Sequence, residues 1–192
     1  MNFKKYRLCM IFLAVLCFLF NSISIAYSEQ NKTVQLIDEN SIVLHTYEEE
    51  TFNLIQEAQN AGFDKIISTS HFKENFYEVP CLERKAWVDA LSQGISEKNM
   101  NVKLYLGNEI YFSSNIVDLI KENKACSINN TKYVLFELPL HSDVPLNLNE
   151  IIYELMENKF VPILAHPERY SFVQKNPNFV YNLIQKGVRY AI

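Results

Sequence analysis

The sequence of 192 residues predicts a mainly parallel α/β domain. Beyond residue 45, apolar runs of strand length alternate with segments that carry a helical apolar stripe. Successive strands lie roughly 25 to 40 residues apart, which leaves room for the crossover helices that parallel strands need. The composition, 48% hydrophobic and 21% charged, is sufficient for one substantial core.

The first predicted helix begins at a Thr46 cap and ends at Gly62. Glutamates at positions 48–50 suit the positive end of its dipole. Its buried stripe is expected to consist of Phe52, Ile55 and Ala58.

The later elements are each predicted from an apolar run or from a stripe of helical period. In order, they are a strand at 65–70, a helix over 82–98 with Pro80 near its start, a strand at 102–108, a short helix over 116–120, a turn at Asn129–Asn130, a strand at 133–138, a helix over 148–157, a strand at 161–164, a helix over 179–186 closed by Gly187, and a strand at 188–192.

Residues 1–28 differ from the rest and predict a secretory signal peptide. A basic start is followed by the apolar run Leu8–Phe20 and by small residues that favour cleavage after Ser28. An uncleaved membrane anchor is the alternative. The chain is therefore expected to be exported or membrane-anchored, and cytoplasmic if this segment does not direct export. Residues 29–45 are interpreted as a divergent N-terminal segment, and 46–192 as the α/β domain.

The net charge of −4 gives no reason to expect a nucleic-acid partner. Cys9 and Cys17 lie within the predicted signal, which leaves Cys81 and Cys126. These two could form a disulfide in an exported protein, but two unrelated thiols are the favoured interpretation.

Metal-capable side chains recur where three predicted strands end. His71 follows the first strand, Glu109 follows the second, and the segment Ala165–Tyr170, with His166 and Arg169, follows a third. Parallel strands share one carboxyl rim, so we expect these groups to converge. Imidazole and carboxylate suit manganese, iron or zinc, with Glu109 as a bridging ligand and Arg169 as a bidentate donor to phosphate.

Three other candidates receive simpler interpretations. Glu137 alternates along a strand and is expected to face solvent or an arginine. His141 is interpreted as a surface residue, and His45 is likewise not expected to be a ligand.

Five stretches together carry a resemblance to a known family: Glu48–Thr51, Ala61–His71, Gly107–Tyr111, Asn130–Pro139 and Pro162–Tyr170. Through them, the chain from about Tyr47 to Ile192 resembles the CpsB/CapC-type manganese-dependent protein tyrosine phosphatases of bacterial capsule and exopolysaccharide loci, within the polymerase-and-histidinol-phosphatase (PHP) superfamily.

The resemblance implies a distorted (β/α)7 barrel, here truncated. It implies that His71, Glu109 and His166 bind manganese or another divalent metal, and that Arg169 holds the phosphate. The implied reaction is hydrolysis of phosphotyrosine by a metal-activated water. The implied substrate is the tyrosine-rich tail of a capsule-regulating kinase, and self-association into a homo-oligomer is left open.

The chain departs from the family pattern at both ends. The family opens with an H-x-H strand, where this sequence has Leu36–His45, and it continues to a D-x-H pair beyond Ile192. We therefore expect an N- and C-terminally incomplete domain with impaired activity. The alternatives are a non-catalytic pseudoenzyme and an exported binding protein on the same scaffold.

Overall fold

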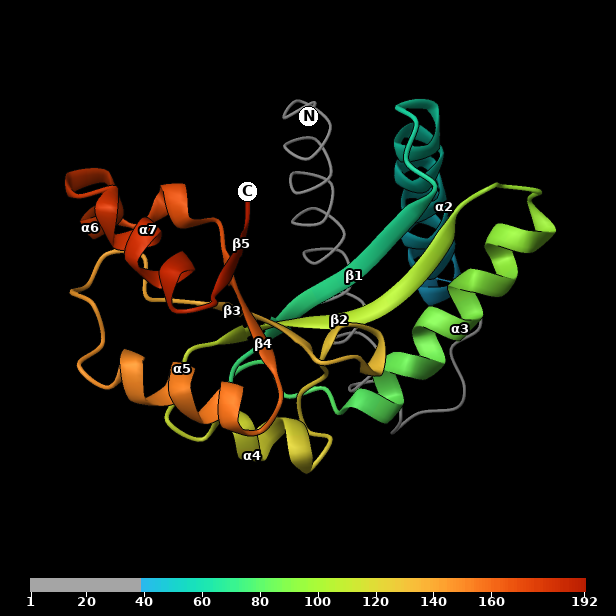
Figure 1. Cartoon of the computed structure of the whole chain (residues 1–192). Coiled ribbons are helices and arrows are strands. Elements are labelled where there is room, and N and C mark those ends of the chain that lie inside the picture. Colours follow the sequence, from blue (N-terminus) through green and yellow to red (C-terminus); the bar gives the residue numbers. More distant parts are fainter. Residues whose placement is uncertain (1–38) are drawn as a thin grey trace. The chain divides into compact units, whose positions relative to one another are not determined.

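A computed structural model describes residues 39–192, with side chains from Glu50 onward, and contains one five-stranded sheet (Figure 1). The strand order follows the chain, β1-β2-β3-β4-β5. The pairs β2–β3, β3–β4 and β4–β5 are all parallel. The predicted α/β class with a parallel sheet is confirmed.

Helices and strands alternate along the chain, as crossovers between parallel strands require. The elements are α2 (Glu39–Asn60), β1 (Lys65–Phe72), α3 (Cys81–Glu97), β2 (Lys103–Tyr111), α4 (Ile116–Lys121), the 3-10 helix η1 (Ile128–Asn130), β3 (Tyr133–Glu137), α5 (Leu148–Glu157), β4 (Val161–Ala165), the 3-10 helix η2 (Pro167–Arg169), α6 (Ser171–Lys175), α7 (Asn178–Gln185) and β5 (Arg189–Ala191).

The described chain divides into two compact units. Unit 1 contains residues 39–70 and Ala86–Tyr105, and its core joins α2 and α3 to the first parts of β1 and β2. The buried members of this core are Phe52, Ile55, Ala58, Ile66, Ile95 and Val102. The predicted stripe of the first helix is therefore buried as expected. Gly62, with φ of 91°, adopts the left-handed conformation that ends α2.

Unit 2 contains His71–Lys85 and Leu106–Ile192. Its core is larger, and α4 and α5 lie on the same face of β3 and β4 (Figure 1). Buried side chains from α4 and α5 pack there against those from the strands. They include Ile116, Val117, Leu119, Ile120, Leu148, Ile151, Ile152, Leu155, Val134, Phe136 and Leu164. At the other end of unit 2, Gly187 closes α7 as predicted.

Several element bounds differ from the prediction. Helix α2 begins at Glu39, so the predicted cap Thr46 lies inside the helix; no proline or glycine occurs between Glu39 and Gly62 to stop it earlier. Strand β1 extends to Phe72 and β2 to Tyr111, past the predicted ends. The short α6 was not predicted, and its buried Val173 packs into the unit 2 core.

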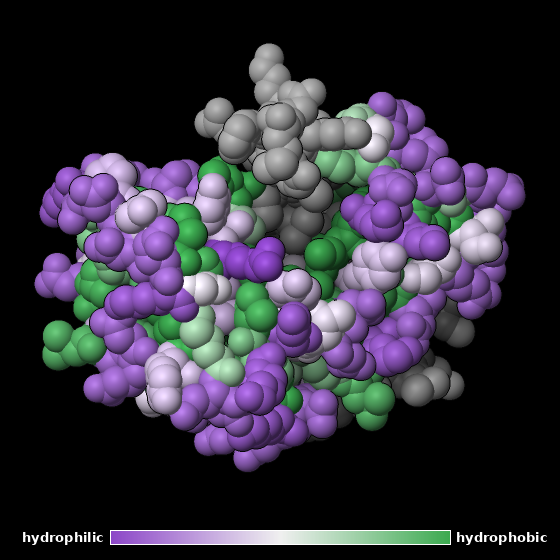
Figure 2. Space-filling model, in the orientation of Figure 1, coloured by the Kyte–Doolittle hydropathy of each residue, from purple (hydrophilic) through white to green (hydrophobic). Residues whose placement is uncertain are grey.

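The predicted signal or anchor (1–28), and the part of the divergent segment before Glu39, lie outside the described residues. Within the described part of the chain, no helix is long and apolar enough to cross a membrane. Hydrophilic residues cover most of the face seen in Figure 2.

Candidate metal centre

Four polar side chains lie at the carboxyl ends of the strands in unit 2. They are His71 near the end of β1, Glu109 near the end of β2, Glu137 at the last position of β3, and His166 directly after β4. The parallel register places Tyr111 opposite Glu137, and Phe136 opposite Leu164. The strand ends therefore share one rim, and the predicted convergence of His71, Glu109 and His166 on it is observed.

Strands β1, β2 and β3 send alternate side chains to opposite faces of the sheet. Phe72, Ile110 and Phe136 are buried in the unit 2 core. Successive side chains of a strand point to opposite faces. The sequence neighbours of these three residues, which are His71, Glu109 and Glu137, therefore project away from that core. The face that carries His71, Glu109 and Glu137 is called the ligand face below.

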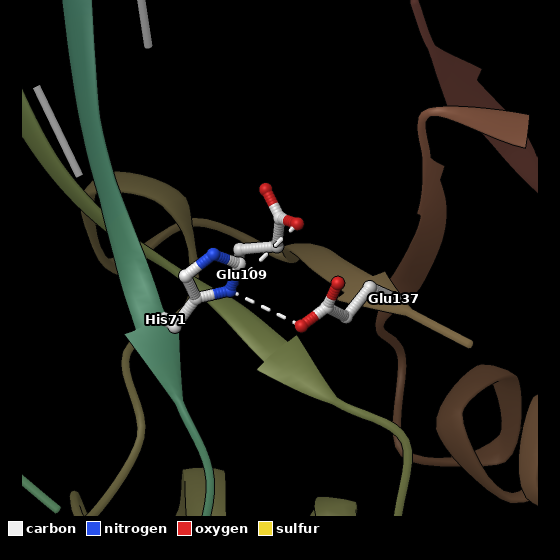
Figure 3. Close-up of side chains that lie close together, drawn as sticks. All are labelled: His71, Glu109 and Glu137. Carbon is white, nitrogen blue, oxygen red and sulfur yellow. Dashed lines mark ion pairs between the residues drawn. The ribbon is translucent and has the colours of Figure 1, made fainter. Parts of the chain in front are cut away.

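The two carboxylates lie between the two imidazoles. Nε2 of His166 is 2.8 Å from Oε1 of Glu109 and 3.3 Å from Oε2 of Glu137. Nδ1 of His71 is 3.1 Å from Oε1 of Glu137 and 3.9 Å from Oε1 of Glu109. Figure 3 shows His71, Glu109 and Glu137 reaching toward one another from β1, β2 and β3. Each carboxylate therefore contacts both histidines.

Burial and hydrogen bonding act in opposite directions on these groups. Burial lowers the pKa of His166, but its hydrogen bonds to Glu109 and Glu137 outweigh this and raise the pKa to about 9. The pKa of His71 is also raised, chiefly by its interaction with Glu137. Burial raises the pKa of Glu137, but the two imidazoles outweigh burial and hold that pKa well below its usual range. A proton on the His166 imidazole thus compensates part of the buried negative charge.

The chemistry of the donor set fits a divalent metal ion. Imidazole nitrogen and carboxylate oxygen together suit manganese, iron or zinc. One ligand atom from each of His71, Glu109 and Glu137 lies within 4.8 Å of the others. Ligand atoms around one cation are roughly 3 to 4.3 Å apart, so small side-chain adjustments suffice. His166 lies outside this group of three, but its Nε2 contacts both carboxylates and offers a nitrogen beside them.

The backbone of His166 is in an uncommon conformation. Its φ of 33° and ψ of 54° lie in the left-handed region, away from the extended conformation that a residue before proline prefers. The His166 amide donates to the Ala191 carbonyl at 2.8 Å, and the Arg169 amide donates to the His166 carbonyl at 3.0 Å. Such backbone strain persists only where the surroundings fix it, and it is common at functional sites.

Tyr170 connects the strand ends that carry Glu137 and His166. Its hydroxyl donates to the Ala165 carbonyl at 2.9 Å and accepts from the Leu138 amide at 2.9 Å. The side chain is fully buried, and its ring centroid is 5.5 Å from that of His166. Tyr170 therefore fixes the spacing of two strand ends, a role that the sequence did not reveal.

Of the other sequence candidates, Glu137 departs most from its interpretation. The expectation that it faces solvent or an arginine is wrong, because its side chain is only 13% exposed and contacts both histidines. The pattern that selected Glu109, a carboxylate at a strand end, could have found it. His141 is exposed, as predicted, and the side chain of His45 lies outside the described ones.

Arg169 is not brought into the cluster. Its side chain is 52% exposed, and its Nε lies 3.7 Å from Oε1 of Glu168. A role in holding phosphate stays a prediction.

Cys81 and Cys126 form a disulfide with a Cα–Cα distance of 5.4 Å, so the interpretation as unrelated thiols is wrong. They meet because the start of α3 lies beside the end of α4, where the Cys81 amide donates to the Asn123 carbonyl at 3.2 Å. The Cys126 amide donates to the side-chain oxygen of Asn108 at 2.7 Å. This hydrogen bond joins the disulfide to Asn108, the residue that precedes Glu109.

Fold and cluster together define an α/β protein with a parallel sheet and a candidate histidine–glutamate metal centre at its strand ends. The chain belongs to the CpsB/CapC family, described as capsular polysaccharide synthesis, whose model matches residues 45–192.

Known proteins similar to this chain include CapC of Staphylococcus aureus, 30% identical over 138 residues, and the tyrosine-protein phosphatase YwqE of Bacillus subtilis, 28% identical over 139 residues. Each match covers 72% of this chain and 54% of the relative. A solved structure from work on YwqE of Bacillus subtilis and CpsB of Streptococcus pneumoniae, described as unique metal-dependent tyrosine phosphatases, is similar with a TM-score of 0.70 and 25% identity. That match covers 74% of this chain and 57% of the solved one. The chain thus spans about half the length of the curated relatives it matches.

Proposed function

We propose that this chain carries part of the active centre of a metal-dependent protein-tyrosine phosphatase that acts in capsule or exopolysaccharide regulation. The observation that carries the proposal is the cluster of His71, Glu109, Glu137 and His166 at the strand ends. Two further facts support it: the chain belongs to the CpsB/CapC family, and relatives over the same region are tyrosine-protein phosphatases.

Within this proposal, the four cluster residues hold the metal, which we take to be manganese. When bound, a divalent metal supplies a Lewis acid for the phosphate and lowers the pKa of a water nucleophile. Tyr170 keeps the ends of β3 and β4 at a fixed spacing and so keeps Glu137 and His166 in register. Arg169 exchanges its solvent-exposed contact with Glu168 for a bidentate contact to phosphate oxygens.

The proposal extends to the fold and the partner. The parallel sheet is part of a distorted (β/α)7 barrel, and residues 46–192 are the phosphatase domain. The substrate is the phosphotyrosine tail of a bacterial tyrosine kinase. Size-exclusion chromatography coupled to light scattering will decide whether the chain forms a homo-oligomer.

We further propose export or membrane anchoring through residues 1–28. The Cys81–Cys126 disulfide supports this, because disulfides persist in oxidising compartments outside the cytosol. Fractionation of cells, with the mass of the mature chain measured in each fraction, tests it. A full-length chain found in the cytosol would argue against export.

The phosphatase proposal is tested with the purified full chain, a phosphotyrosine peptide and manganese. We expect phosphate release that a chelator abolishes, that manganese restores, and that Glu137→Gln removes. The exposed Glu150→Gln is the matched control, because it removes the same charge outside the cluster. Absence of both phosphate release and bound manganese would reject the proposal.

A second candidate is a non-catalytic binding protein on the same scaffold. One observation favours it: α2 begins at Glu39, so residues 39–45 are helical where the family resemblance leads us to expect the H-x-H strand. Manganese binding and phosphopeptide binding without any phosphate release would support this candidate over the enzyme.

A further inference from the structure

Residues 73–80, called the aromatic loop below, follow β1 directly and expose two large aromatic side chains. Phe76 is 71% exposed and Tyr77 is 46% exposed. Neither ring belongs to the unit 2 core. Rigid aromatic side chains offer large contact area at small entropic cost, which is why they are frequent at binding sites.

The aromatic loop is held in one shape by its own contacts. The amides of Lys73 and Tyr77 donate to each other's carbonyls at 3.2 and 2.8 Å, and Asn75 turns the chain with φ of 64°. The Asn115 side-chain amide donates to Oε2 of Glu74 at 2.9 Å, and the loop runs into the Cys81–Cys126 disulfide. A surface ordered before binding loses less entropy when a ligand arrives.

Lys73, the first residue of the aromatic loop, projects on the same side as the ligand face. Because Phe72 points into the core, His71 and Lys73 on either side of it leave the strand on the opposite face. Tyr111 lies two residues beyond Glu109 on that same face, and Nζ of Lys73 is 4.0 Å from the centroid of its ring. Two residues of extended strand span about 6.5 Å, so this pair lies one repeat beyond the metal-capable side chains.

The Lys73 ammonium is held between two rings. It lies 4.7 Å from the centroid of Phe76 as well as 4.0 Å from that of Tyr111. These are distances at which an ammonium is attracted to an aromatic face. An aryl phosphate joins an anionic phosphate to an aromatic ring. The ammonium of Lys73 is complementary to the phosphate charge, and the two neighbouring rings are complementary to the aromatic ring.

We infer that Lys73, Phe76 and Tyr111 form the subsite that selects aryl over alkyl phosphates, and so selects phosphotyrosine over phosphoserine. The inference rests on the proposed function, because it takes the cluster as the site that receives the phosphate. Lys73 attracts the phosphate dianion, and the rings of Phe76 and Tyr111 contact the substrate ring. A phosphoserine side chain, which lacks the ring, gains the charge attraction but not the ring contacts.

Binding to the manganese-loaded full chain tests this without turnover. The probes are two peptides of one sequence, one with 4-phosphonomethylphenylalanine and one with an alkyl phosphonate in place of phosphoserine, titrated by calorimetry. We expect the aryl peptide to bind about tenfold more tightly. Phe76→Ala should weaken aryl binding about threefold to tenfold and leave alkyl binding unchanged. Lys73→Met should weaken both peptides.

Lys98→Met is the matched control. Its ammonium lies 4.9 Å from the centroid of Phe52 in unit 1, so the variant removes the same charge and the same kind of ring contact. We expect it to bind both peptides like the parent chain. Because Phe76 is largely exposed, Phe76→Ala should keep the parent melting temperature, which thermal unfolding checks.

Equal binding of the two peptides, binding of neither, or an unchanged aryl-to-alkyl ratio in Phe76→Ala would overturn the inference. The outcome is separable from that of the proposed function. Aryl-selective binding without phosphate release would uphold the subsite and reject the phosphatase. Phosphate release with equal binding of both peptides would do the reverse.

Discussion

Unit 1 and unit 2 are built from similar helices and strands, but their interiors differ in charge. Among the side chains that the structure describes, every buried charged or imidazole group lies in unit 2: Arg84, Glu109 and His166. Unit 1 buries hydroxyl groups and apolar side chains. Because buried charge is costly unless it is compensated, its confinement to unit 2 distinguishes the unit that holds the candidate metal centre from the one that does not.

The largest effect should come from removing a cluster side chain. His166→Ala should lower manganese-dependent hydrolysis of a phosphotyrosine peptide by more than about 100-fold, the upper range for residues that only support a ligand. Steady-state kinetics and manganese titration by calorimetry measure this. His141→Ala is the control, because His141 is exposed in the same unit. Equal losses in both variants would contradict a special role for the cluster.

Loss of the disulfide should have the next largest effect, on stability. The bond joins residues 45 positions apart, and its removal in Cys81→Ala/Cys126→Ala should lower the free energy of unfolding by about 2–4 kcal/mol. Urea denaturation measures the loss, and the parent chain under a reducing agent should match the double variant. Two titratable thiols in the unreduced parent, at these two positions, would disprove the bond.

Tyr170→Phe should have a smaller effect on stability and a specific effect on the metal. Loss of the Tyr170 hydroxyl leaves the Leu138 amide and the Ala165 carbonyl without their partner, which should lower the free energy of unfolding by about 1–3 kcal/mol. Because Tyr170 spaces Glu137 from His166, manganese affinity should fall about tenfold as well. Tyr153→Phe, at a site 64% exposed, should change neither. Lower stability with unchanged manganese affinity would limit Tyr170 to a structural role.

The smallest effect should come from Gly94→Ala in unit 1. A Cβ at Gly94 would lie 2.3 Å from Cζ of Phe52, so the buried ring must shift. We expect a loss of about 0.5–2 kcal/mol, since the crowding is offset in part by alanine's helix propensity. Chemical denaturation of Gly94→Ala, Phe52→Leu and the double variant measures the coupling between the two positions. The double variant should lose less stability than the sum of the two single losses. Reduced manganese affinity in Gly94→Ala would contradict the division of roles between the units.

Much of this architecture was predictable because it follows local rules. The apolar stripe of α2 and the glycines that end α2 and α7 were read directly from residue patterns. The convergence of His71, Glu109 and His166 followed from one topological rule, that parallel strands share a carboxyl rim.

What the sequence missed depends on contacts between distant residues. Glu137 has the pattern of a solvent-facing strand residue, and only the approach of β1 and β4 turns it into a partner of two histidines. The Cys81–Cys126 bond depends on how α3 begins beside α4, and the Tyr170 bridge depends on how η2 folds back over β3. Neither the disulfide nor the Tyr170 bridge has a sequence spacing that could be recognised in advance, whereas the position of Glu137 at a strand end was a usable signal.

The alternation along β1, β2 and β3 makes the cluster and the core depend on a single register. Deleting one residue upstream in β2 would exchange the faces of Glu109 and Ile110, placing a carboxylate in the apolar core and a leucine-sized side chain among the histidines. We therefore expect one insertion or deletion in these strands to disturb the core and the cluster together, whereas a substitution changes one position. Any selection for a stable core also preserves the alignment of the metal-capable side chains, without acting on them directly.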